Sequence, residues 1–438
     1  MRVLYIPSRA ILRSSVPKHT TTAVALQPVA ASLQGSTCRA LHLHTRRERV
    51  SLGQNPGRET APTISIVQRR NMSSPADHKP LDKPPKTPPM PVPSASVLVI
   101  SPTNQVLLLH RVRTASAFSS AHVFPGGAIS PEHDGPIPNI TDTNPNQPAY
   151  RLAAIRETFE ESGILLAKKN GKLFTDIGDA EREEGRKAVH AGTTLFADLL
   201  SKWGCEPDVE GLIPFTRWIT PPNVKKRFST QMYIYFLPLG STLPGNSKSQ
   251  ASGDAARLDD VEAADIVIPH PTHDGGIEHT AARFLPPNKW INLANQNRII
   301  LFPPQYFLAW HLAPFLAPTV TSPSSPSPSI AELQAERDRL TAFLQSEAGD
   351  EFSKAIISPV ALGKGDYGED KQDGVGGVTK DTAVLRLDYP GPELDKAGVK
   401  GTMTKWVVTT KFKKEGPRDV RVVERGRILG KDGKASRL

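Results

Sequence analysis

Cysteine is nearly absent from this sequence: its 438 residues include only two, Cys38 and Cys205. Disulfide frameworks and structural zinc sites need several suitably spaced cysteines, so two distant thiols support neither. Cys38 falls in a basic N-terminal segment. We interpret Cys205 as an ordinary half-buried residue.

Long apolar runs are also missing. No stretch approaches the roughly 20 apolar residues that a membrane-spanning helix needs, so we expect a soluble chain without a membrane span. The hydrophobic content of 38% still allows a real core. The 41 prolines are unevenly spread, which indicates linkers around a smaller folded unit.

Acidic residues are scarce at both ends of the chain. Residues 1–71 contain 11 Lys/Arg and 2 Asp/Glu, residues 399–438 contain 12 and 4, and residues 72–398 contain 31 and 38. The net charge of +10 therefore arises at the ends, around an acidic middle. A nucleic-acid enzyme more often carries its basic stripe on the folded unit, so this distribution disfavours a nucleic-acid partner.

The two ends resemble targeting signals. The first 47 residues lack Asp and Glu and scatter arginines among Ser, Thr and Ala, as a mitochondrial transit peptide does. We interpret 1–71 as a targeting leader in a disordered N-terminal extension, unless translation starts at Met72. The chain stops at Ser436-Arg437-Leu438, a conservative form of the tripeptide read by the peroxisomal import receptor. The expected location is the peroxisomal matrix, with the mitochondrion as the alternative; the two signals could serve different isoforms.

The middle of the chain reads as one folded domain between linkers. Residues 72–95 are a proline-rich linker, and 96–318 form the main domain, in which 131–148 and 241–256 are inserted loops. A hairpin is expected around Pro102-Thr103-Asn104, followed by a strand that ends in Gly126-Gly127. Helices are expected at 148–162 and 179–203 and strands at 214–221 and 228–239. After a Ser/Pro linker at 319–330, residues 331–438 form a small C-terminal extension of one helix and a few strands.

The helix expected at 148–162, capped by Gly163, carries three glutamates on one side. At about 100° per residue, Glu157, Glu160 and Glu161 fall at roughly 0°, 300° and 40°, and the apolar residues fall on the opposite face. Like charges at this spacing destabilise a helix by roughly 0.2–0.5 kcal/mol per pair. Hard divalent cations prefer several carboxylate oxygens, so a bound Mg²⁺ or Mn²⁺ would turn the repulsion into coordination.

The same residues resemble a known motif. Gly127 followed by Arg156-Glu157-Thr158-Phe159-Glu160-Glu161-Ser162-Gly163-Ile164 is similar to the Nudix box, G-x5-E-x7-R-E-U-x-E-E-x-G-U. The resemblance implies an α/β fold, specifically an α/β/α sandwich with a mixed sheet and a loop–helix–loop metal site. It also implies hydrolysis of nucleoside diphosphates linked to another moiety.

The motif departs from the family pattern in two ways. Thr158 stands where an aliphatic residue is usual. Gly127 and Arg156 lie 29 positions apart where the box has 14, so 15 extra residues are inserted between them. The insertion leaves the first glutamate of the box without a counterpart. Glu132 and Asp134 are near, and neither can be assigned from the sequence.

The interrupted box resembles the peroxisomal coenzyme A diphosphatases of the Nudix family. The segment LLLHRVRTASAFSSAHVFPGG keeps part of a coenzyme A signature in register, with Val112, Ser116 and Ser120 as departures. RWITPPNVKKRFST is similar to a further segment of the interrupted-box members. The resemblance covers roughly residues 94–315.

Roles follow from this resemblance. Glu157 and Glu161 are the expected metal ligands, Glu160 is a third ligand or the general base, and Arg156 orients the glutamates. The expected substrate-binding residues are Arg111, Phe124, Gly126, Gly127 and Arg227. Lys225 and Lys226 either contact the 3′-phosphate of coenzyme A or form a solvated basic turn. Trp218 and Phe228 are read as core residues, and the irregular spacing of His270, His273 and His279 disfavours zinc.

Three hypotheses remain open. The first is a Mg²⁺- or Mn²⁺-dependent hydrolase that splits coenzyme A or acyl-coenzyme A into 3′,5′-ADP and (acyl-)4′-phosphopantetheine. The second is the same chemistry on another nucleotide, such as NADH, ADP-ribose or capped RNA. The third is a Nudix-fold binding module without catalysis, against which the retained glutamates argue.

Overall fold

The computed structural model describes residues 88–111, 120–240, 271–272, 279–316, 328–363, 378–379 and 381–429. All of them belong to the compact unit Lys79–Leu438. The leader at 1–71, the loop at 241–256, most of the two linkers and Ser436-Arg437-Leu438 lie outside the described residues.

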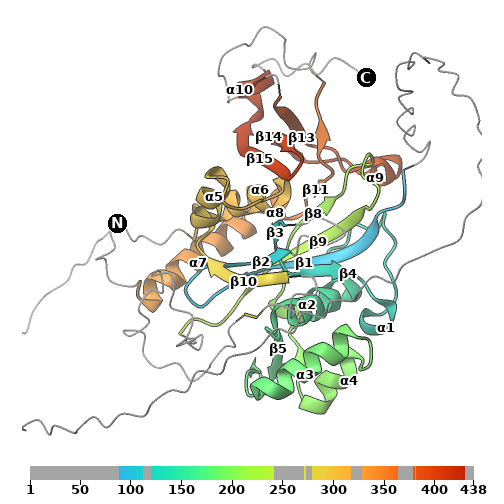
Figure 1. Ribbon diagram of the computed structural model, residues 1–438, viewed down its shortest axis with the longest axis vertical. Helices are drawn as coiled ribbons and strands as arrows, with labels where there is room; N and C mark the ends of the chain where they lie inside the picture. Colours follow the sequence, from blue (N-terminus) through green and yellow to red (C-terminus); the bar gives the residue numbers. More distant parts are fainter. Residues whose placement is uncertain are drawn as a thin grey trace, which may run out of the picture. The chain divides into compact units, whose positions relative to one another are not determined.

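A mixed eight-stranded sheet forms the centre of the described chain (Figure 1). Its main path runs β10-β2-β1-β9-β8-β11, with β3 beside β2 and β4 beside β1. The β1/β9 and β8/β11 pairs are parallel, and the other pairs are antiparallel. The strands are β1 Val92–Ile100, β2 Val106–Arg111, β3 His122–Val123, β4 Gly126–Ala128, β8 Ile213–Ile219, β9 Phe228–Phe236, β10 His279–Leu285 and β11 Ile356–Ile357.

Helices cover both faces of this sheet. Because side chains alternate along a strand, Val97 and Val99 of β1 pack into the cluster that contains α2, whereas Leu98 and Ile100 pack into a second cluster. The second cluster holds residues of four other helices. These are α5 Pro287–Asn295, α6 Pro303–Leu312, α7 Ile330–Gln345 and α8 Glu347–Ser353; α2 spans Pro148–Ser162. The predicted α/β/α arrangement with a mixed sheet is confirmed.

The predicted hairpin is formed by β1 and β2 around a turn with Asn104 at φ 58°. β1 begins earlier than the sequence indicated, inside the segment read as a linker. It can do so because Pro93, which lacks an amide hydrogen, contributes its carbonyl to the amide of Ile129.

The helical region expected at 179–203 is two helices, α3 Asp179–His190 and α4 Phe196–Trp203. They are separated by a turn with Gly192 at φ 67°. A small sheet of β5 Ala167–Lys169, β6 Lys172–Leu173 and β7 Glu206–Pro207 lies nearby in sequence, followed by the 3-10 turn η1 Val209–Gly211. The inserted loop at 131–148 contains one short helix, α1 Pro131–Asp134.

The C-terminal residues predicted as an extension join the same core. Leu340 of α7, Phe352 of α8 and Leu385 of β13 belong to the second apolar cluster. The last strands form a separate four-stranded sheet in the order β12-β13-β14-β15. The strands are β12 Val360–Ala361, β13 Ala383–Leu387, β14 Met403–Lys413 and β15 Gly416–Glu424. Two short helices belong to the same region of the sequence, α9 Pro392–Lys396 and α10 Arg425–Leu429.

Within the described ranges, no helix has both the length and the apolar composition needed to cross a bilayer.

Candidate active site

Helix α2 carries the glutamates and ends as predicted. Gly163 adopts the left-handed conformation, at φ 72°, and its amide donates to the carbonyl of Phe159 over 2.8 Å. The carboxylate side of the helix is covered by neighbouring elements. Glu160 is 7% exposed and Glu161 is 8% exposed, because β4 and α3 pack beside that side of α2. Glu160 and Glu161 are therefore buried, whereas Glu157 is partly buried.

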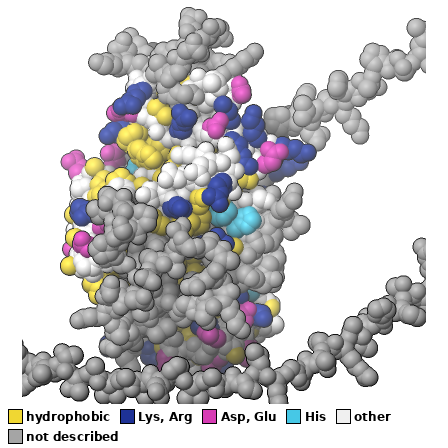
Figure 2. Space-filling view, turned by 60° about the vertical axis from the view of Figure 1, so that its left-hand side comes forward, with side chains coloured by type: hydrophobic (Ala, Val, Ile, Leu, Met, Phe, Trp, Pro, Cys, Tyr) yellow, Lys and Arg dark blue, Asp and Glu magenta, His cyan; other side chains and the backbone are white. Residues whose placement is uncertain are grey.

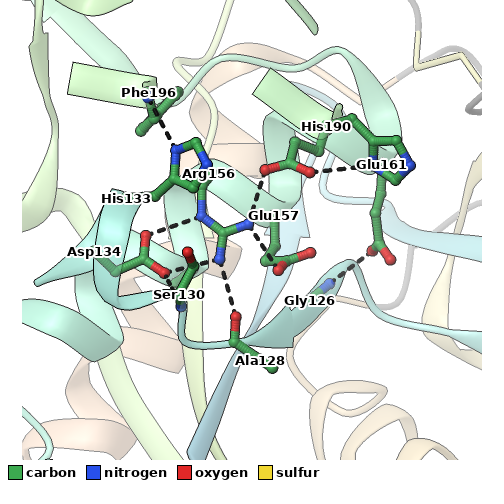
Figure 3. A network of polar contacts seen from close by, with 12 residues as sticks. Gly126, Ala128, Ser130, His133, Asp134, Arg156, Glu157, Glu161, His190 and Phe196 are labelled. Atoms are coloured by element: carbon green, nitrogen blue, oxygen red, sulfur yellow. Dashed lines mark hydrogen bonds and ion pairs between the residues drawn. The ribbon is translucent and has the colours of Figure 1, made fainter. Parts of the chain in front are cut away.

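Arg156 organises the cluster (Figure 3). Its guanidinium is 4% exposed and donates to both carboxylate oxygens of Asp134, over 2.9 and 2.8 Å, and to the carbonyl of Ala128 over 3.0 Å. The carboxylate of Asp134 also accepts from the amide of Ser130. Asp134 is thus the acidic partner of Arg156 that the sequence could not identify, whereas Glu132 is exposed and bonds Ser130. The insertion hid this pair, because it separates the two residues by 22 positions.

One guanidinium nitrogen serves two further carboxylates. Nη1 of Arg156 donates to Glu157 over 2.9 Å and to Glu160 over 2.8 Å. Arg156 therefore faces three carboxylates with a single positive charge. Burial, with a further contribution from Glu160, raises the pKa of Glu157 to about 7 despite the charge of Arg156. Burial lowers the pKa of Arg156, but Asp134, Glu157 and Glu160 raise it by more, so that it lies above the ordinary value.

The double glycine lies directly against these acids. The amide of Gly126 donates to Glu161 Oε2 over 2.8 Å. A Cβ atom placed on Gly127 would lie 2.5 Å from the carboxylate atoms of Glu157. Only a residue without a side chain allows this approach. Glu157 and Glu161 therefore lie directly beside Gly126-Gly127.

Two histidines lie near the glutamates, and neither was assigned to the site from the sequence. His190, at the end of α3, lies with Nδ1 3.2 Å from Glu160 Oε2, and its side chain is 39% exposed. His279, the first residue of β10, is fully buried with Nε2 3.7 Å from Glu161 Oε1. Nothing local in the sequence marks either residue, because both reach α2 only through tertiary packing. His270 and His273 lie outside the described residues.

The cluster fits a hard divalent cation. Glu157 and Glu161 are one helical turn apart and both border the double glycine. Arg156 offers a single positive charge to Asp134, Glu157 and Glu160, so the printed contacts leave the cluster with an excess of carboxylates. No group of three His, Cys, Asp or Glu side chains among the described residues is arranged to hold an ion alone. Mg²⁺ is usually bound through one or two carboxylates, with waters and substrate phosphates completing its shell, so two glutamates suffice.

Arg111 lies close to the cluster, at the end of β2. It is the direct cross-strand partner of His279, and cross-strand partners project their side chains from the same face of a sheet. Since His279 lies beside Glu161, Arg111 on the neighbouring strand β2 faces the same side of the sheet as the carboxylates.

Two other predicted substrate residues lie elsewhere. Phe124 is 4% exposed and belongs to the second apolar cluster, on the sheet face opposite α2. Arg227 is 1% exposed and donates to the carboxylate of Glu393 over 2.5 and 3.1 Å and to the carbonyl of Thr220. Its guanidinium holds α9 against the end of β9, so we leave Arg227 out of the site proposed below.

The basic turn before β9 leaves Lys225 exposed, and Lys226 lies over the ring of Phe228 at 5.4 Å. Trp218 is 5% exposed in the second apolar cluster, as expected of a core residue.

Replacing Asp134 with asparagine is expected to destabilise the protein. Arg156 keeps Glu157 and Glu160 as partners, but the amide of asparagine cannot accept both guanidinium bonds, and each lost bond to a charged group costs about 1.5–3 kcal/mol. Equilibrium unfolding in urea measures the change. Glu132→Gln is the control, and it should leave the midpoint unchanged because Glu132 is exposed. Equal midpoints for Asp134→Asn and wild type would refute the role of this pair.

Comparison with known proteins agrees with the motif. The family model described as the NUDT19 Nudix domain matches residues 133–249. The acyl-coenzyme A diphosphatase NUDT19 of Xenopus laevis is 26% identical over 217 residues, which cover 38% of this chain and 57% of that protein. The acyl-coenzyme A diphosphatase NUDT19 of Gallus gallus is 27% identical over 179 residues, 30% of this chain and 47% of that protein.

The chain thus spans about half the length of these curated relatives. A crystal structure of a NUDIX hydrolase from Alicyclobacillus acidocaldarius aligns with 50% of this chain and 90% of its own, at 20% identity and a TM-score of 0.38. The segment 133–249 that the family model matches contains α2 with Arg156 and the three glutamates. Together, the interrupted box and the sequence matches show that this chain is similar to Nudix-family proteins, and in residues 133–249 to the NUDT19 Nudix domain.

Proposed function

We propose that the protein is a divalent-metal-dependent hydrolase that cleaves the phosphoanhydride bond of coenzyme A or acyl-coenzyme A. The products are 3′,5′-ADP and 4′-phosphopantetheine or its acyl derivative. The observation that carries the proposal is the position of Glu157 and Glu161 directly against Gly126-Gly127, where a diphosphate can approach the backbone closely.

Mg²⁺ or Mn²⁺ bound by Glu157 and Glu161 would neutralise the diphosphate and activate a water molecule. Arg156 is fixed by Asp134 and Ala128 and holds Glu157 and Glu160 in place. We assign Glu160 the role of accepting a proton from the attacking water.

The contact between Glu160 and His190 provides a path by which that proton can reach solvent. Glu160 Oε2 lies 3.2 Å from His190 Nδ1, and the imidazole is partly exposed. A proton taken up by the carboxylate can therefore pass to a group that reaches solvent.

Two observations support coenzyme A as the substrate class. The segment from Leu107 to Gly127 retains part of a coenzyme A signature, and the named relatives from Xenopus and Gallus are acyl-coenzyme A diphosphatases. Arg111 is the proposed phosphate contact, because its planar fork suits phosphate oxygens and β2 brings it near the carboxylates. NADH, ADP-ribose and capped RNA are the alternative substrates.

We propose the peroxisomal matrix as the location, through recognition of Ser436-Arg437-Leu438 by the import receptor. The mitochondrion is the alternative, through the leader at 1–71.

A substrate panel tests the activity. The full chain is incubated with Mg²⁺ or Mn²⁺ and coenzyme A, an acyl-coenzyme A, NADH, ADP-ribose or capped RNA, and the products are identified by mass. We expect kcat/KM for a coenzyme A compound to exceed that for the other nucleotides by about tenfold or more, because one lost hydrogen bond to a charged group costs about 1.5–3 kcal/mol. Faster turnover of NADH would overturn the substrate assignment. A folded protein that hydrolyses nothing would leave only the binding-module hypothesis.

A further inference from the structure

A second pocket lies on the sheet face opposite the glutamates. Its volume is about 230 Å³, and it opens among β2, β3, β10 and α5. His110 of β2 and His122 of β3 are cross-strand partners on its wall. His110 directly precedes Arg111, so the pocket and the carboxylates share the same end of β2 on its two faces.

The charged residues of this pocket are all basic. Arg283 and Arg298 line it together with the two histidines, and no described lining residue is Asp or Glu. Both arginines are exposed, and neither side chain is bonded to another described residue. Figure 2, turned to bring the left side of Figure 1 forward, shows histidine side chains beside Lys or Arg within a partly hydrophobic surface. Two unpaired guanidinium groups are suited to phosphate oxygens.

The pocket also has a flat aromatic wall. The rings of His110 and His122 are stacked, with centroids 4.7 Å apart and planes 23° apart. Trp290 adjoins them at 5.6 Å and is held by a bond from its indole nitrogen to the carbonyl of Val106. The imidazole Nδ1 of His122 is buried without a hydrogen-bond partner among the described residues. Burial, His110 and the charge of Arg283 lower the pKa of His122 to about 3, so the ring is neutral and faces a positive field.

The size of the pocket limits its ligand. Sites for drug-sized ligands occupy about 300–1,000 Å³, so about 230 Å³ holds one ring with a phosphate group rather than a whole dinucleotide. Basic groups at the edge and rings on the wall match that combination.

We propose that this pocket binds the phosphate-bearing adenosine part of a nucleotide, with Arg283 and Arg298 on the phosphate and the histidine pair against the ring. The proposal rests on the proposed function for the identity of the nucleotide, 3′-phosphoadenosine. The ligand has two possible sources: the nucleotide half of the substrate, or released 3′,5′-ADP.

Calorimetric titration of the full chain with 3′,5′-ADP tests the pocket without requiring hydrolysis. The Arg283→Ala/Arg298→Ala variant should have a Kd for 3′,5′-ADP at least about tenfold higher than wild type, because it loses both charge-assisted contacts. The control is Arg339→Ala/Arg427→Ala, which removes two exposed arginines on α7 and α10 and should bind like wild type. Equal binding by the pocket variant and wild type, or no binding by wild type, overturns the proposal.

Kinetics then separate the two sources, and both outcomes support the pocket. If the substrate itself enters, the pocket variant raises KM for coenzyme A but not for dephospho-coenzyme A. If only free 3′,5′-ADP enters, KM is unchanged and 3′,5′-ADP still binds when the active site is saturated. The substrate panel fails or succeeds independently of this titration, so the two proposals are tested separately.

Discussion

Replacing Glu161 with glutamine is expected to lower kcat/KM by about 10²–10³, the effect seen when one preorganised electrostatic group is removed from an active site. The carboxamide has nearly the shape of the carboxylate but cannot supply a negative charge to a cation. Its oxygen can still accept from the amide of Gly126, as Glu161 Oε2 does over 2.8 Å. The fold should therefore survive while the activity falls.

The same substitution should raise the metal concentration needed for half-maximal rate. Hydrolysis rates measured over a series of Mg²⁺ and Mn²⁺ concentrations, with circular dichroism to check folding, provide the readout. Glu184→Gln is the matched control, because Glu184 is exposed on α3 and should leave rate and metal dependence unchanged. A fully active Glu161→Gln variant would remove the metal role from this residue and leave the binding-module hypothesis standing.

The parts of the site that could be predicted depend on local spacing. The periodicity of residues 148–162 and the terminal Gly163 predicted α2 within its observed bounds. The mutual repulsion of Glu157, Glu160 and Glu161 indicated a compensating partner. In the structure that partner is partly Arg156, whose Nη1 bonds two of the three.

The parts that could not be predicted depend on tertiary contacts. Asp134 reaches Arg156 from the other end of the inserted loop, and the loop length conceals the pairing. His279 reaches Glu161 because β10 pairs with β2 across an intervening stretch of 167 residues. Likewise, Arg227 fits a phosphate contact by residue type alone, and only the fold brings Glu393 to it.

Burial also changes what the acidic face means. Helical geometry alone places the glutamates opposite the apolar residues, as on an ordinary solvated surface. The structure covers most of that side as well, and the one guanidinium of Arg156 faces three carboxylates. Burying a charge is costly unless it is paired, and a cation bound here would supply the missing partner. The metal hypothesis therefore has a stronger physical basis in the fold than in the sequence.

The Gly127→Ala variant separates catalysis from folding. The added Cβ would lie 2.5 Å from the carboxylate of Glu157, too close for any contact, so one of the two groups must move. The carboxylate is the free end of a flexible side chain and can turn away at little cost to the fold. A shift of about 1 Å at a reacting group can cost about 10² in rate, and we expect a loss of that size in kcat/KM.

The free energy of unfolding of the Gly127→Ala variant should rise slightly or stay the same. Gly127 has no strained backbone angle, and replacing glycine by alanine at a compatible site stabilises by about 0.4–1 kcal/mol through the unfolded chain. Gly178→Ala is the control, since a Cβ there meets nothing within 4 Å, and it should leave kcat/KM unchanged. Gly126→Ala differs from both: its Cβ would lie 2.3 Å from the carbonyl oxygen of Ala95, which is fixed backbone, so that variant should unfold more easily. An active Gly127→Ala enzyme would show that the position of Glu157 against the double glycine is not needed for the reaction, and the metal site would then have to lie elsewhere on α2.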